Sequence, residues 1–339
     1  MKHHVNVPIF IPHLGCPNQC VFCNQRTISG VTEFNISLVT EQIETALSTV
    51  GGDTTAEIAF FGGSFTGIDR SLMIQLLEIT DGYVKAGRVE SVRCSTRPDY
   101  ISAEILDILE KYNVKTIELG LQSIDDGVLS VAKRGHDSAC ATAACKMIVE
   151  RGFSLVGQMM IGLPAATSES ELETADFIIN SGAVGARIYP TVVFHQTELA
   201  DMSRFGVYTP LTVEEAVVRS AAVMRKFIDA GVDVIRVGLC ASENLAGEDT
   251  YLAGPNHPAI GELVENEIFY GLIKDEINKI NIKSNSKITV SVPRGSLSKA
   301  IGQKRKNKLR LLKEFSISYI AFEENEQLFD YSIAVREER

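Results

Sequence analysis

The sequence lacks any apolar run of the roughly 18 to 20 residues that a membrane-spanning helix requires. Its first ten residues, MKHHVNVPIF, contain neither the apolar core nor the cleavage-site pattern of a secretory signal. Seven cysteines in 339 residues are too few, and too clustered, for a disulfide framework. These absences predict a cytoplasmic protein with no membrane partner, whose thiols stay reduced and whose clustered cysteines have a metal or redox role.

Charge is spread unevenly along the chain. The formal net charge of −10 argues weakly against a nucleic-acid partner. Residues 281–339, however, carry 12 Lys and Arg against 7 Asp and Glu, whereas residues 1–280 carry 21 against 36. The resulting net charges of +5 and −15 indicate a basic appendage that binds a polyanion, with a solvated basic helix as the alternative.

Short β-rich runs alternate with amphipathic helical stretches. Strands are expected at 5–12, 56–63, 91–98, 116–123, 154–164, 186–194 and 232–239. Helices are expected at 72–84, 103–112, 140–151, 169–180, 212–230 and 262–280. Apolar strands separated by helices predict parallel pairing through right-handed βα units, and six units in a row favour an α/β fold with a partial (βα)6 TIM-like barrel. The polar motifs follow strand ends, where barrels carry their chemistry.

Three cysteines lie within eight residues, in the string LGCPNQCVFCN, at Cys16, Cys20 and Cys23. A structural zinc site normally closes with four ligands, often from two separated pairs. The other cysteines form no second pair of that kind, so three thiolates favour an iron–sulfur cluster with one open iron. His13 could serve as a fourth ligand, which leaves a Cys3His zinc site as the alternative.

This C-x3-C-x2-C spacing, with the aromatic Phe22 before the third cysteine, resembles the signature of the radical S-adenosylmethionine (SAM) superfamily. The resemblance implies a partial barrel in which Cys16, Cys20 and Cys23 are the metal ligands of a 4Fe-4S cluster and carry the catalysis. SAM would bind the open iron. An electron from the low-potential cluster would then split SAM into methionine and a 5′-deoxyadenosyl radical.

Two further strings extend the resemblance to the cofactor site. FFGGSF resembles the glycine-rich segment that binds the SAM amino group, and MMIGLP resembles the segment that packs against adenine. Glycines let the main chain approach a ligand closely, although each string could also be an ordinary turn or strand end. SAM contacts are therefore expected from Phe22, Gly62, Gly63, Ser64, Glu118, Gln122 and Gly162. Ser64 stands where many members have Glu, and Arg97 is either a carboxylate contact or part of a structural ion pair.

Several strings together resemble one branch of the superfamily: STRPDYI, ELGLQSIDDGVL, KRGHD, MMIGLPAAT and RIYPTVVFHQTEL. They are similar, in the same order over roughly residues 6–240, to the radical SAM domain of the Elongator catalytic subunit and its bacterial relatives. That family modifies carbon 5 of the wobble uridine of tRNA with an acetyl group from acetyl-CoA. The residues after the bridging helix are too few for the acetyltransferase domain of that family. The resemblance therefore implies neither the use of acetyl-CoA nor the same product for this chain.

The last segment contains a β-branched run at 287–292, a short helix to Ile301, a basic helix at 306–315 and a strand at 317–322. This order, with Gly302-Gln303-Lys304-Arg305 between the helices, resembles a KH RNA-binding module, in which a GXXG loop clamps the nucleic-acid backbone. Arg305 replaces the second glycine. Leu309, Leu312 and Phe315 are expected to face the core. RNA contacts are expected from Lys299, Lys304, Arg305, Lys306, Lys308 and Arg310.

The expected organisation is a radical SAM barrel with an extension at 1–260, a bridging helix at 261–284 and a KH-like module at 285–339. The leading hypothesis is a radical SAM enzyme that modifies RNA as a transferase acting on tRNA, with a low-potential electron donor as a further partner. The alternatives are a radical SAM enzyme acting on a small molecule or protein, and a non-catalytic RNA-binding iron–sulfur protein. Lys133, Arg134 and Lys226 are candidates to line an RNA path, and Tyr189 to face the substrate.

Overall fold

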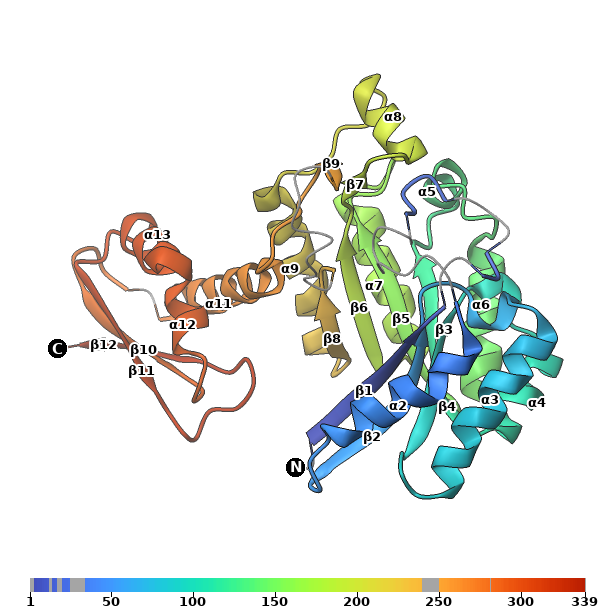
Figure 1. Cartoon of the computed structure of the whole chain (residues 1–339). Coiled ribbons are helices and arrows are strands. Elements are labelled where there is room, and N and C mark those ends of the chain that lie inside the picture. Colours follow the sequence, from blue (N-terminus) through green and yellow to red (C-terminus); the bar gives the residue numbers. More distant parts are fainter. Residues whose placement is uncertain are drawn as a thin grey trace. The chain divides into compact units, whose positions relative to one another are not determined.

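The computed structural model describes residues 3–11, 14–16, 20–24, 34–239, 250–280 and 282–338. It divides into two compact units (Figure 1). The first comprises Met1–Leu211 and Lys226–Asn256, and the second Thr212–Arg225 and His257–Arg339. Helix α9 (Val213–Asp229) therefore contributes residues to both. Across the described ranges, no helix has the length and apolar character needed to cross a membrane.

The first unit is built on a seven-stranded sheet in the order β1-β2-β3-β4-β5-β6-β8, in which every neighbouring pair is parallel. The strands are β1 (His3–Phe10), β2 (Thr54–Phe61), β3 (Ser91–Thr96), β4 (Val114–Gln122), β5 (Ser154–Ile161), β6 (Gly185–Pro190) and β8 (Asp233–Val237). Figure 1 shows the sheet curled, with helices packed along its outer side. This arrangement confirms the predicted partial barrel.

This unit contains the helices α2 (Val39–Ser48), α3 (Arg70–Lys85), α4 (Ala103–Lys111), α5 (Asp126–Val131), α6 (Ser138–Glu150), α7 (Ser168–Asn180) and α8 (Glu198–Arg204). All the helices named here except α2 begin at a polar residue whose side chain caps the first turn. The Asp69 side chain accepts hydrogen bonds from two amides of the first turn of α3, and Ser102, Asp137 and Thr167 each accept one at α4, α6 and α7. Because each cap satisfies amides that a helix leaves unbonded, it fixes the start of its helix.

The predicted strand 186–194 is wrong in its second half. Strand β6 ends at Pro190, and β7 (Val193–Phe194) pairs antiparallel with β9 (Tyr251–Ala253) in a separate two-stranded sheet. The Gly238 amide still donates to the Ile188 carbonyl at 2.9 Å. The next amide that β6 would offer to β8 belongs to Pro190, which has no hydrogen to donate.

The second unit contains a three-stranded sheet in the order β11-β10-β12. The central β10 (Lys287–Val292) pairs parallel with β11 (Tyr319–Glu324) and antiparallel with β12 (Ala334–Glu338). Two helices, α12 (Leu297–Ile301) and α13 (Lys306–Glu314), connect β10 to β11. This order confirms the small C-terminal α+β module, while its likeness to a KH module stays a prediction.

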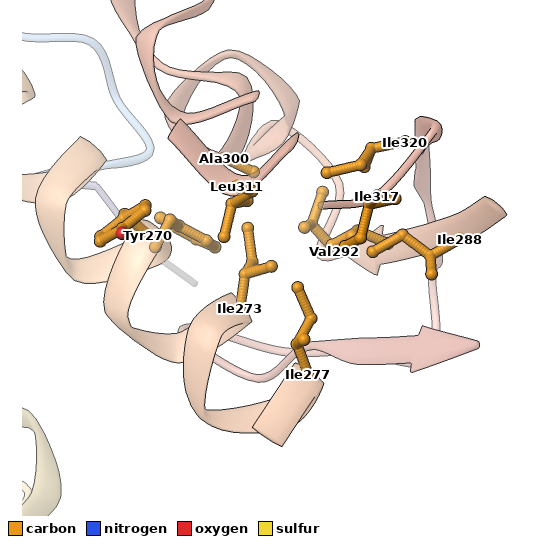
Figure 2. Packing of buried hydrophobic residues seen from close by; sticks show 11 residues of the cluster. Tyr270, Ile273, Ile277, Ile288, Val292, Ala300, Leu311, Ile317 and Ile320 are labelled. Atoms are coloured by element: carbon orange, nitrogen blue, oxygen red, sulfur yellow. The ribbon is translucent and has the colours of Figure 1, made fainter. Parts of the chain in front are cut away.

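Helix α11 (Ile260–Lys279), expected only to bridge, supplies part of the core of this module. Figure 2 shows Ile273 and Ile277 of α11 directed toward side chains of the sheet and the two short helices, and Tyr270 of the same helix belongs to this buried cluster. The rest of the buried cluster is Phe269, Ile288, Val290, Val292, Ala300, Leu311, Ile317 and Ile320. Since fully burying one such aliphatic side chain contributes about 2 kcal/mol, α11 helps to stabilise the module.

The buried face of α13 differs from the prediction at Leu309, whereas Leu312 and Phe315 pack against the core as expected. Leu309 is 60% exposed, whereas Leu311 is fully buried and Asn307 nearly so. The Asn307 Nδ2 donates to the main-chain oxygens of Asn266 at 2.6 Å and Ala300 at 3.3 Å. Because residues 307 and 311 are one turn apart, this polar anchor and Leu311 fix which side of the helix faces inward, and Leu309 faces solvent.

Candidate functional site

The cysteine segment after β1 packs main chain to main chain against the loop after β2. A Cβ at Gly15, which has φ +85°, would lie 2.5 Å from the carbonyl oxygen of Ser64. A Cβ at Gly67 would lie 2.5 Å from the carbonyl oxygen of Gly15. Only glycine fits so close an approach. The packing brings the Cys16 Sγ to 3.5 Å from the Ser64 Oγ, and leaves 3.9 Å between that sulfur and a Cβ built at Gly63.

The neighbouring Gly62 has φ +100°, and a Cβ there would lie 3.1 Å from the main-chain nitrogen of Ile11. Its glycine identity therefore has a reason in the fold itself, namely the contact with the end of β1. The two glycines keep side chains away from this stretch, as a segment that binds a ligand through its main chain requires. Their contact with SAM stays a prediction.

The buried Cys20 faces two arginines from other parts of the barrel edge. The Nη1 of Arg134 lies 3.1 Å from the Cys20 Sγ, and the Nη1 of Arg97 lies 3.9 Å from it. Cys20 is 7% exposed, and the two arginines are 5% and 4% exposed. Next to it, the Val21 amide donates to the Ala132 carbonyl at 3.3 Å, which anchors the segment beside α5. The cysteine thus lies in a buried cationic environment.

The described carboxylates balance only one of the two positive charges beside Cys20. Arg97 makes a two-fold pair with Asp99 at 2.8 and 2.9 Å. Burial lowers the pKa of Arg97, but the bond to Asp99 and the nearby thiols outweigh it and raise that pKa. Arg134 donates to the Gly120 carbonyl at 2.7 Å, its Nε has no partner, and no carboxylate of the described ranges pairs with it. A buried cation without a counter-ion is costly, so an anionic group belongs beside Cys20.

The structure does not gather the three cysteines into a closed ligand set. Cys16 and Cys23 are half-buried, and the Cys23 amide donates to the Cys20 carbonyl at 2.9 Å. Among the residues that the structure describes, no three His, Cys, Asp or Glu side chains are grouped so as to hold a metal ion. Residues 17–19 and the alternative ligand His13 lie outside the described ranges. The donor chemistry fits an anionic iron–sulfur group, with three thiols on one segment and two guanidiniums facing one of them.

Glu118 receives its partners from the protein, where SAM had been expected to supply them. Its carboxylate, fully buried, accepts hydrogen bonds from Arg187 at 2.8 and 2.9 Å, from Arg93 at 2.9 Å and from Gln158 at 2.9 Å. Burial raises the pKa of Glu118, but the bonds and charges of the two arginines outweigh burial and lower it. The four residues come from β3, β4, β5 and β6, so they tie the strands together inside the barrel. A SAM contact of Glu118 stays a prediction.

Gln122 offers an acceptor that the protein leaves unused. It has φ +69° at a register shift between β4 and β5. Its Oε1 is buried and has no hydrogen-bond partner within the described part of the chain. Buried polar atoms are almost always bonded, so this oxygen fits a donor from a ligand. The geometry supports the predicted role of Gln122 better than that of Gly162, whose amide and carbonyl are bonded to Glu171 and Tyr208 at 2.6 Å each.

Phe22 and the residues expected to line an RNA path have other contacts. Phe22 packs against a buried cluster formed by Val21, Ala132, Val193, Leu199, Ala200 and Tyr208. Lys133 pairs with Glu198, and Lys226 pairs with Asp176 at 2.5 Å. Arg134 is buried beside Cys20, so its prediction as an RNA contact is wrong. The charge pattern of KRGHD could not reveal that its arginine turns inward, because that depends on the packing of α5.

His136, in the string KRGHD, is a buried polar group close to the two arginines. Its side chain is fully buried, and its Nδ1 lies 3.8 Å from the Asp99 Oδ1. Burial, and then the charge of Arg134, lower the pKa of His136 to about 4, against the opposing effect of Asp99. The imidazole is therefore neutral at neutral pH and adds no charge beside Arg97 and Arg134.

Two of the six predicted RNA-binding cations are engaged within the C-terminal module. Lys299 pairs with Glu265 at 2.8 Å. Arg310 pairs with Glu267 at 2.5 and 3.1 Å, and its guanidinium carbon lies 3.5 Å from the centre of the Tyr270 ring. Both acidic partners belong to α11, which lies outside the basic segment on which the prediction of RNA contacts was based. These two cations are held in intramolecular pairs that fasten α12 and α13 to α11.

The other four cations lie around the loop between α12 and α13 and form no ion pair with any described residue. They are Lys304, Arg305, Lys306 and Lys308. The first three are exposed, and the Lys308 Nζ lies 5.3 Å from the centre of the Tyr319 ring. Lys304 and Arg305 have φ +53° and +63°. Arg305 thus takes the left-handed conformation at the position where the GXXG pattern has its second glycine.

The family model of the Radical SAM superfamily matches residues 10–178, and the model of the Radical_SAM C-terminal domain matches residues 183–269. An uncharacterized protein of Methanocaldococcus jannaschii is 31% identical over 210 residues, which are 58% of this chain and 64% of that protein. A tRNA uridine(34) acetyltransferase of Methanocaldococcus infernus is 30% identical over 129 residues, 36% of this chain and 23% of that enzyme. This chain thus spans less than two thirds of the length of either relative.

Among solved structures, the archaeal Elp3 of Methanocaldococcus infernus with an N-terminal deletion has a TM-score of 0.59 at 19% identity, over 84% of this chain and 65% of that one. At that identity the likeness concerns the fold alone, and it agrees with the curled parallel sheet. Proteins of the matched superfamily use a 4Fe-4S cluster and SAM. The two family models, the cysteine spacing and the partial barrel agree, and the chain belongs to the radical SAM superfamily.

Proposed function

We propose that this chain is a radical SAM enzyme that modifies RNA and that its substrate is a tRNA. The observation that carries the enzymatic part is Arg134, which lies beside Cys20 and pairs with no carboxylate of the described ranges. Cys20 belongs to the cysteine segment that packs against the loop after β2. A buried cation of this kind is expected where an anionic group is to be held. The RNA part is supported by the relationship to a tRNA uridine(34) acetyltransferase and by Lys304, Arg305, Lys306 and Lys308, which form no ion pair with any residue that the structure describes.

In this proposal Cys16, Cys20 and Cys23 hold the 4Fe-4S cluster, which when bound supplies the electron that splits SAM into methionine and a 5′-deoxyadenosyl radical. The residues of the chain bind and orient. Gly62 and Gly63 keep the main chain accessible to the SAM amino group. The Oε1 of Gln122 accepts a hydrogen bond from the bound molecule. The reductant is a donor of low potential.

The four remaining cations would bind the phosphates of the tRNA. A cationic loop recognises an RNA backbone without reading its sequence, and its affinity falls steeply with salt because counterions are released on binding. Since this chain spans only 23% of the acetyltransferase relative, the group that is transferred and the use of acetyl-CoA are not part of the proposal.

The test of the chemistry is SAM cleavage. Full-length protein, reconstituted anaerobically with iron and sulfide, is mixed with SAM and dithionite, with or without unmodified tRNA, and 5′-deoxyadenosine is quantified by mass spectrometry. We expect cleavage that rises with tRNA, that is lost in the variant with Cys16, Cys20 and Cys23 all changed to Ala, and that survives in Cys140→Ala. The absence of SAM cleavage by cluster-loaded protein would contradict the proposal that the chain is a radical SAM enzyme. Cleavage indifferent to tRNA would contradict the RNA substrate and direct the search to small molecules or proteins.

The test of the RNA surface is the salt dependence of tRNA binding. Changing Lys304, Arg305 and Lys306 to Ala is expected to weaken binding and to make the slope of log affinity against log salt shallower by about 2 to 3, since each phosphate contact contributes about 0.7 to 0.9. The matched control changes Lys279, Lys283 and Lys287 of the same module to Ala and removes the same charge elsewhere. Equal effects of the two triple variants would mean that net charge, and no particular loop, attracts the RNA.

A further inference from the structure

We infer that Arg134 is a positioning residue that raises the reduction potential of the iron–sulfur group held through Cys20, with Arg97 and Asp99 holding it in place. The inference rests on the proposed function, since it requires an electron-accepting group on the cysteines. It adds a role that the cysteine motif does not contain, because Arg134 lies 114 residues away from Cys20 in the sequence.

The contact is directed at one of the cysteines. The Arg134 Nη1 donates to the Cys20 Sγ at 3.1 Å, and Arg97 approaches the same sulfur at 3.9 Å. Cys16 faces a neutral hydroxyl instead, the Oγ of Ser64 at 3.5 Å. A hydrogen bond from a charged donor to a thiolate is stronger than one between neutral groups. Cys20 is therefore the ligand through which the protein's charge acts on the bound group.

Arg134 is fixed from three sides, as a positioning role requires. Its Nη2 donates to the Gly120 carbonyl on β4 at 2.7 Å, and its own main-chain oxygen accepts a hydrogen bond from Arg97. Its amide donates to the Leu129 carbonyl at 3.0 Å, at the end of α5.

The charges near Cys20 sum to an excess of one positive charge. Arg97 and Arg134 are both cationic, Asp99 neutralises Arg97 through its two-fold pair, and the buried His136 is neutral because its pKa lies at about 4. The potential of an iron–sulfur cluster depends on its net charge, on hydrogen bonds to its sulfurs and on its exposure to solvent. An unbalanced buried cation bonded to a ligand sulfur stabilises the added negative charge of the reduced state, so it makes reduction by a low-potential donor easier.

The experiment is an equilibrium redox titration of the reconstituted full chain without SAM. Dithionite is added stepwise as the reductant, and mediator dyes equilibrate the cluster with the potential measured in solution. The reduced cluster is quantified by electron paramagnetic resonance. At the midpoint potential of the wild type, we expect Arg134→Gln to lower the ratio of reduced to oxidised cluster about tenfold, which for one electron equals a shift of about 59 mV to lower potential. Arg134→Lys keeps the charge and is expected to recover at least half of the shift.

Two further variants keep the inference testable if Arg134→Gln assembles no cluster. Asp99→Asn removes the carboxylate that offsets Arg97, so we expect the midpoint to move in the opposite direction, to higher potential. Arg187→Gln removes a buried guanidinium that bonds to Glu118 and is expected to leave the midpoint near that of the wild type. An Asp99→Asn midpoint at or below the wild-type value, or equal shifts for Arg134→Gln and Arg187→Gln, would overturn the inference. Wild-type protein with no reducible cluster would instead overturn the proposed function on which it rests.

Discussion

Glu118→Gln is the substitution whose effect on stability is best defined by the structure. The carboxylate is fully buried between two arginines and accepts four hydrogen bonds of 2.8 to 2.9 Å. Glutamine has the same shape, but it presents an NH2 group where guanidinium donors point. The variant would therefore keep Arg93 and Arg187 buried while it removes the negative charge between them.

Removing one partner of a buried ion pair typically costs about 3 to 5 kcal/mol, because the remaining charge is buried without a counter-ion. Arg93 also pairs with Glu57 at 2.5 Å, which offsets part of the loss. We therefore expect the free energy of unfolding to fall by about 3 kcal/mol at neutral pH. The folded-state pKa of Glu118 lies below its ordinary value of 4.5. The wild-type advantage should accordingly be complete above that value and disappear as pH falls through the folded-state pKa.

The assay is urea unfolding of the full chain, followed by circular dichroism, at neutral pH and at a series of acidic pH values. The matched control is Glu104→Gln, which breaks the exposed pair with Arg70 at 3.4 Å and is expected to change the free energy of unfolding by less than about 1 kcal/mol. If Glu118→Gln cost no more than this control, or if the difference from wild type stayed constant into acid, the reasoning on the buried charges would be refuted.

Three further predictions concern single side chains. Gly302→Ala should destabilise the C-terminal module by about 1 to 3 kcal/mol in calorimetry, since its Cβ would lie 2.8 Å from the Asn307 Cγ. The control Gly295→Ala has a similar φ of +81° but no atom near the added Cβ, so it should destabilise the module less. Equal destabilisation by the two variants would contradict the predicted clash. Arg305→Gly should raise the melting temperature, because it relieves about 1 kcal/mol of strain in the left-handed backbone conformation. The same substitution should weaken tRNA binding. A lower melting temperature would contradict the argument from strain. The pKa of His136 is lowered to about 4 in the folded state, so as pH falls the unfolded state binds this proton before the folded state does. Stability should therefore fall by roughly 3 kcal/mol as pH drops from 6.5 to 4, and His136→Phe should flatten this dependence unless other groups cause it.

Local sequence patterns predicted the elements of the barrel well. The caps at Asp69, Ser102 and Thr167 explain why three of the predicted helices begin within two residues of the expected position. The predicted strand at 287–292 coincides with β10. Where a pattern failed, a neighbour outside the segment decided. The ladder between β6 and β8 stops at Pro190, and Asn307 determines the buried face of α13.

The candidate site shows the same division. The C-x3-C-x2-C spacing was sufficient to predict the superfamily, because it lies within one segment. The partners of the site residues were not predictable. Glu118 meets Arg93 and Arg187 at separations of 25 and 69 residues, and Lys299 and Arg310 meet carboxylates of α11 at 34 and 43. No period of two or 3.6 residues links positions so far apart.

The sequence by itself therefore determined the order of strands and helices, the clustered cysteines of the superfamily signature and the basic character of the last segment, since each depends on residues close together in the chain. Only the tertiary structure decided which charges are paired and which are not. It buried Arg134 beside Cys20 without a carboxylate, gave Lys299 and Arg310 their acidic partners, and left Lys304, Arg305 and Lys306 unpaired at the surface within the described ranges. The physical reason is that an ion pair needs two side chains a few ångströms apart, and the register and curl of the sheet, together with the packing of α5 and α11, set those distances.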